Sequence, residues 1–208
     1  MALVKSSRPS ADSDPTPGAS GDDRQSWIAD LASDVTGRRR AAARALAELP
    51  DAVPLLLAHL AKEEALSVRS IILTGLILHK SPMVVAGLMP LLACEDANLR
   101  CGAVEALQEM PDEVAPHVER LLDDPDSDVR IATVMILSSL PHPRVPVWLQ
   151  RVVATDPHVN VAAAALDALA ELGDLDAIDA IESLPGRFPD VSYIAFAADV
   201  AIKRIRGR

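Results

Sequence analysis

The sequence has very few aromatic side chains. They make up 2% of the 208 residues, although half of the chain is hydrophobic. Few aromatics leave few platforms on which the bases of a single-stranded nucleic acid could stack. The alternating Val, Ile, Thr and aromatic pattern of β-strands is also missing. Alanine, leucine and valine supply the apolar mass, and such small side chains suit closely packed helices. The composition therefore predicts an all-α protein.

Cysteines and long apolar runs are scarce as well. Two cysteines, Cys94 and Cys101, do not make a disulfide framework, and we expect both to be small buried residues in the reduced state. No stretch approaches the roughly 18 apolar residues of a membrane span. The apolar run at 2–4 is too short for a signal peptide. The sequence predicts a cytoplasmic protein without a membrane partner, and its Arg-rich, Lys-poor usage suggests a bacterial source.

Basic residues are fewer than acidic ones, 20 against 30, so the formal net charge is −10. An acidic surface repels a phosphate backbone, so nucleic acid is not an expected partner. Motifs of nucleophilic hydrolases, nucleotide-binding loops and zinc peptidases are missing too. We therefore predict no catalytic residues, no cofactor and no metal site, and no enzymatic activity. The histidines show no spacing typical of metal ligands; they are His59, His79, His117, His142 and His158.

Two regions differ in composition. Residues 1–24 are rich in Ser, Asp, Pro and Gly, which predicts a disordered N-terminal arm. This arm is either a flexible leader or a peptide that a partner recognises. Residues 25–208 repeat one pattern and form a single predicted domain.

The repeat begins with a short acidic motif that ends in arginine. DPDSDVR at 124–130 aligns with CEDANLR at 94–100, EEALSVR at 63–69 and DPHVNVA at 156–162. The last residues of these motifs, with positions 39 and 195, define six units whose steps are 30 to 33 residues. Apolar residues follow each of these positions at helical spacing, and Pro or Gly often ends the pattern. Six second helices are predicted, at 36–49, 66–79, 97–110, 127–140, 158–172 and 191–206.

Each second helix is preceded by a shorter first helix, and 25–33 supplies the one in the first unit. A pair of about 30 residues cannot bury its own apolar face, so pairs stack side by side and the stack curves. The predicted fold is a right-handed α-solenoid of about six helix pairs. Asp or Ser of the motif, just before the second helix, can cap its free N–H groups. The arginines of the motif are predicted to form a structural ladder that reaches the adjacent unit: Arg69, Arg100 and Arg130.

The strings DPDSDVRIATVMILSSLP and DPHVNVAAAALDALAELGDLDAIDAI resemble HEAT repeats. They are most similar to the short subtype of phycobilisome lyase subunits. The resemblance covers 25–208. The sequence departs from the family pattern in the first unit, where arginines replace the acidic motif, and in the last two units, which lack the arginine. The family includes adaptors, assembly factors, lyase subunits and a few nucleic-acid enzymes, so the resemblance specifies the fold and leaves the function open.

The concave side of the stack is the predicted binding surface. Positions one, five and eight after each motif should point outward there, from Arg40 and Ala47 in the first unit to Phe196 and Val200 in the sixth. Apolar residues among them suggest a contact patch, unless the alignment is off by one residue and they belong to the core. The residues predicted to contact a partner are Arg40, Arg44, Thr74, Ile77, Glu105, Gln108, Ile131, Met135 and Asp167.

The sequence is compatible with three functions. The first is a protein-binding scaffold, an adaptor or an assembly factor for a larger complex. The second, which the resemblance implies, is a lyase-type or maturation factor that assists cofactor attachment to a client protein. The third is a nucleic-acid-binding repeat protein, which Glu105 and Asp167 on the predicted binding surface disfavour.

Overall fold

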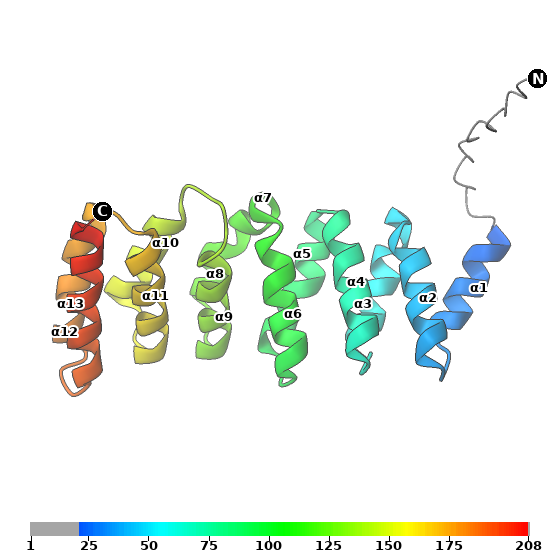
Figure 1. Ribbon diagram of the computed structural model, residues 1–208, viewed down its shortest axis with the longest axis horizontal. Helices are drawn as coiled ribbons and strands as arrows, with labels where there is room; N and C mark the ends of the chain where they lie inside the picture. Colours follow the sequence, from blue (N-terminus) through cyan, green and yellow to red (C-terminus); the bar gives the residue numbers. More distant parts are fainter. Residues whose placement is uncertain (1–20, 208) are drawn as a thin grey trace, which may run out of the picture.

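The computed structural model describes residues 21–207 as an α-solenoid, and the predicted fold is confirmed (Figure 1). The second helices lie side by side in one row. Each begins and ends within three residues of its predicted limits. They are α2 (Thr36–Ala47), α4 (Leu66–Leu78), α6 (Ala97–Gln108), α9 (Ser127–Leu137), α11 (Val159–Leu172) and α13 (Ser192–Arg206).

The first helices pack behind this row and are shorter in most units. Two of them, at 53–60 and 118–122, follow a 3₁₀ turn that carries Pro at its first or second position, where a missing N–H costs least. The helices are α1 (Gly21–Leu31), α3 (Val53–Leu60), α5 (Pro82–Leu88), α7 (Pro111–Val114), α8 (Val118–Leu122), α10 (Val145–Thr155) and α12 (Ile178–Arg187). The 3₁₀ turns are η1 (Pro50–Ala52), η2 (Met89–Ala93), η3 (Ala115–His117) and η4 (Leu175–Ala177).

The first helix begins earlier than the sequence predicts. Helix α1 starts at Gly21, so residues 21–24 of the predicted arm are helical. Asp22 and Asp23 in the first turn favour the positive end of the helix dipole. Arg24 forms an ion pair of 3.2 Å with Asp51 of the next unit. The rest of the predicted arm lies outside the described residues.

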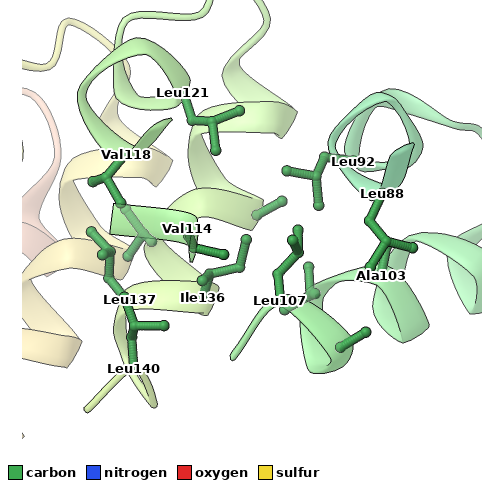
Figure 2. Close-up of a cluster of buried hydrophobic side chains, with 14 of the residues drawn as sticks. Leu88, Leu92, Ala103, Leu107, Val114, Val118, Leu121, Ile136, Leu137 and Leu140 are labelled. Carbon is green, nitrogen blue, oxygen red and sulfur yellow. The ribbon is translucent and has the colours of Figure 1, made fainter. Parts of the chain in front are cut away.

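One apolar core runs through the stack. Between the third and fourth units, Leu88 and Leu107 face Val118 and Ile136 across the boundary (Figure 2). All four side chains are fully buried. Because each boundary is filled by residues from both neighbours, every unit depends on the next for its core. No helix within residues 21–207 has both the length and the apolar character needed to cross a membrane.

The second helices approach one another closely where one of them carries a small residue. A Cβ at Gly75 of α4 would collide with the Cβ of Ala47 in α2. A Cβ at Gly102 of α6 would lie 2.6 Å from Leu73 of α4. These contacts leave Ala47 buried, which corrects the prediction that it points outward.

Candidate functional site

A ladder of arginines runs along one edge of the stack, at the start of the second helices. Each motif arginine donates to the carbonyl oxygen six residues earlier and so fixes the turn that leads into its helix. Position 39 of the first unit behaves in the same way. The pairs are Arg39 with Ser33 (2.9 Å), Arg69 with Glu63, Arg100 with Cys94 (2.6 Å) and Arg130 with Asp124 (2.9 Å).

Three of these arginines also reach a carboxylate of the following unit. Bonds from the guanidinium to the carboxylate join Arg39 to Glu63 (2.8 Å), Arg69 to Asp96 (2.7 Å) and Arg130 to Asp156 (2.8 Å). Arg39 was not among the arginines predicted for the ladder, and the first unit lacks the acidic motif. Position 39 is equivalent to the motif positions 69, 100 and 130, and this equivalence was the signal in the sequence for its role.

The fifth unit replaces the missing arginine with one from its neighbour. Ala162 stands at the motif position, and the carbonyl six residues earlier belongs to Asp156. Arg187, at the end of α12, donates to that carbonyl and to the carbonyl of Val153. Asp156 thus contacts Arg130 from the unit before and Arg187 from the unit after.

Glu63 is the most heavily bonded acid of the ladder. Its carboxylate accepts two bonds from Arg39 (2.8 and 2.9 Å), one from the backbone N–H of Ala65 (2.8 Å), and lies 2.9 Å from His59 Nε2. Burial raises the pKa of Glu63, but the hydrogen bonds from Arg39, Ala65 and His59 outweigh it and lower the pKa to about 2. The group therefore stays ionised and structural.

The exposed side of the six second helices is the second surface of interest, and we call it the second-helix face. The predicted contact residues Arg40, Arg44, Thr74, Glu105 and Asp167 are exposed on it. Met135 is exposed by 46%. Three further predicted residues are half-buried: Ile77, Gln108 and Ile131. Met135 therefore lies outside the core, whereas Ile77 and Ile131 pack against the core with one side and remain partly exposed.

Three hollows open on this face between neighbouring helices. The one between α4 and α6 has a volume of about 470 Å³, and Thr74, Ile77 and Glu105 line it. The hollow between α6 and α9 is lined by Ile131 and Met135.

The third hollow lies between α11 and α13. Asp167 lines it, together with Tyr193, Phe196 and Val200, which are exposed by 45 to 68%. Arg40 and Arg44 line none of the three hollows, so the structure separates them from the other predicted contact residues.

Several lining residues were missing from the predicted contact set. Leu73 and Val104 stand four positions after their motif arginines, on the side of the helix that turns toward the neighbouring unit. Glu109 and Asp128 lie at the ends of the hollows. Only the packing of adjacent helices reveals these positions, because a pattern read along one helix does not say where the next one lies.

The cysteines differ from prediction. Cys101 is exposed and lines two of the hollows, and Cys94 is half-buried. Cys101 lies on the exposed side of α6, and Cys94 is the C-cap residue of η2, ahead of α6. Among residues 21–207, no group of three or more His, Cys, Asp or Glu side chains is placed to hold a metal ion.

The repeat, the motif arginines and the stacked helix pairs agree with comparisons with known proteins. A family model of HEAT repeats matches residues 53–138 and 114–187. The chain belongs to the HEAT-repeat family. A second model, of the PBS lyase HEAT-like repeat, matches residues 38–62 of this HEAT-repeat protein. No curated protein matches the chain.

Several solved structures show a similarity to the chain. An engineered protein is 19% identical, with 89% of this chain and 97% of the other covered and a TM-score of 0.42. The complex of CpcE and CpcF of phycocyanin lyase from Nostoc sp. PCC7120 is 20% identical, with 96% and 99% covered and a TM-score of 0.37. A designed armadillo repeat protein is 15% identical, with 88% and 99% covered and a TM-score of 0.37.

Proposed function

We propose that this HEAT-repeat protein is a scaffold, acting as an adaptor or assembly factor, that binds a partner protein through the second-helix face. The observation that carries the proposal is the hollow between α6 and α9. Its lining includes Ile131 and Met135 on a surface that the fold would allow to be polar, with the buried Val104 beneath them. Apolar hollows of this kind are typical of protein contact sites, and Met adapts its shape to a partner.

The charge pattern supports a protein over a nucleic acid as the partner. Glu105 and Asp167 are exposed on the same face and would repel phosphates. Salt-sensitive retention on DNA would contradict this choice. We propose no catalytic activity, since the ionised groups with the most contacts, such as Glu63 and Arg130, are occupied in the ladder.

The test is a pull-down from native lysate with the full chain, analysed by mass spectrometry. Ile131→Asp with Met135→Asp should abolish capture of a stoichiometric partner, because two charges would enter the apolar hollow. The matched control is Met83→Asp with Val147→Asp, on first helices α5 and α10, where both side chains are exposed. The control should retain the partner, and circular dichroism should show equal helicity for all three proteins. Capture by both variants would overturn the proposal.

A second candidate is a lyase-type or maturation factor that assists cofactor attachment to a client protein. It is favoured by the match of residues 38–62 to the PBS lyase HEAT-like repeat. The measurement is the absorbance spectrum of a captured client after co-expression with and without this protein. A client that carries pigment or metal only when the HEAT-repeat chain is present would move the assignment to this class.

A further inference from the structure

Two hollows lie side by side on the second-helix face, one on each side of α6. Cys101 of α6 lines both of them, so the two hollows are adjacent. We call the two together the central groove. Its apolar lining comes from three successive second helices, and it consists of Leu66, Leu73, Ile77, Val104, Ile131 and Met135.

The lining of the groove carries more negative than positive charge. Glu105, Glu109 and Asp128 line it with exposed side chains, and none of them forms an ion pair within residues 21–207. Of the two arginines in the lining, one is paired with an acid outside it and the other offsets one of the three negative charges. Arg69 pairs with Asp96, and Arg100 donates to the carbonyl of Cys94.

We propose that the central groove binds a cationic amphipathic segment of the partner protein. This inference rests on the proposed function and specifies the chemistry of the partner. Apolar side chains of the segment would fill the floor between α4, α6 and α9. Lysine or arginine stems would pack along its apolar walls while their charged heads reach Glu105, Glu109 and Asp128. The three unpaired carboxylates would repel an acidic segment and speed the approach of a basic one.

The probes are two fluorescein-labelled amphipathic peptides of equal length, one of Leu and Lys and one of Leu and Glu. Their binding to the full chain is measured by fluorescence anisotropy at several salt concentrations. We expect the Leu/Lys peptide to bind with a Kd that weakens as salt rises, and the Leu/Glu peptide to bind at least tenfold more weakly. Glu105→Gln with Glu109→Gln and Asp128→Asn should weaken binding of the Leu/Lys peptide at least tenfold.

A matched control separates the groove from the overall charge of the protein. Asp112→Asn with Asp179→Asn and Asp190→Asn removes the same number of exposed carboxylates from other places. This variant should change the Kd less than twofold. Equal weakening by both triple variants would show that net charge alone attracts the peptide and would overturn the inference.

The failure of this inference and the failure of the proposed function have different signatures. If the groove triple variant binds the Leu/Lys peptide as wild type does, while Ile131→Asp with Met135→Asp still loses the native partner, the face binds proteins without selecting cations. If the apolar variant keeps the partner as well, both proposals fail.

Two other occupants have outcomes of their own, one in the peptide assay and one in sedimentation equilibrium. Residues 1–20 carry Lys5 and Arg8, and Lys5→Glu with Arg8→Glu would tighten peptide binding tenfold if that segment filled the groove. A second copy of the chain would supply Arg40 and Arg44, and Arg40→Glu with Arg44→Glu would then turn a dimer into a monomer in sedimentation equilibrium. Either result would overturn the assignment to a partner protein.

Discussion

Glu63 shows how one residue can make a structural contact sensitive to pH. It is 3% exposed, yet its carboxylate remains charged because Arg39, Ala65 and His59 surround it with hydrogen-bond partners. The unfolded chain offers none of these partners, so the ordinary pKa of 4.5 returns on unfolding. Since the folded pKa is the lower one, the ionised carboxylate stabilises the fold at neutral pH.

Glu63→Gln should lower the free energy of unfolding at pH 7 by about 3 kcal/mol, an upper figure from the shift in pKa. The wild-type contribution is fully present above pH 4.5 and is lost as the pH falls toward 2. The difference between the two proteins should therefore shrink over that range. Urea unfolding at pH 7, 5, 4 and 3 measures it, with Glu95→Gln at an exposed site as the control. A difference that stays constant with pH would contradict the assignment.

At the scale of the element, the packing of α4 on α2 depends on a missing side chain. Alanine in a helix interior is normally more stable than glycine by about 0.5–1 kcal/mol. At Gly75 that preference is reversed, because a Cβ there would meet the Cβ of Ala47. A methyl group on a short side chain cannot move aside, so the two helices would have to separate.

Gly75→Ala should therefore destabilise the protein by about 1–3 kcal/mol, the usual cost of overpacking. Gly37→Ala is the matched control, because nothing lies within 4 Å of a Cβ at that position of α2. The control should be neutral or stabilising by up to about 1 kcal/mol. Thermal unfolding followed by circular dichroism compares the two variants. A Gly75→Ala protein as stable as wild type would show that α2 and α4 have room to separate.

At the scale of the whole molecule, cohesion depends on the boundaries between units. In a solenoid each unit contacts only its neighbours, so stability is a sum of units and boundaries. Asp156 holds three units together, through its carboxylate to Arg130 and its carbonyl to Arg187. Both members of the ion pair are buried, with 8% exposure for Arg130 and 6% for Asp156. Breaking such a pair leaves a buried charge without a partner.

Asp156→Asn should cost about 3 kcal/mol or more and loosen the last two units before the first three. Hydrogen exchange followed by mass spectrometry should show faster exchange in α10 to α13 than in α2 to α6. Asp123→Asn is the control, because Asp123 pairs with Arg151 at an exposed site, where a pair contributes about 1 kcal/mol or less. Equally faster hydrogen exchange in all six units would contradict this prediction, because it would mean that the whole stack unfolds in one cooperative step.

Much of this architecture follows from the sequence by itself. The second helices could be placed within three residues because apolar residues with a period of 3.6 recur in every unit, so errors in one unit are corrected by the others. The outward direction of Met135 and Glu105 follows from the same period, since a helix that buries one side exposes the other.

Tertiary structure decided what lies between the helices. Ala47 is buried because Gly75 of the next unit comes close enough to cover it. Arg187 takes the place of an arginine that its own repeat lacks, from a helix outside the motif. The central groove lies between α4, α6 and α9. The distance from each of these helices to the next is set by side chains from both of the units that meet there. Periodicity along one helix specifies which side it buries, whereas the distance to the next helix depends on the volumes of both partners.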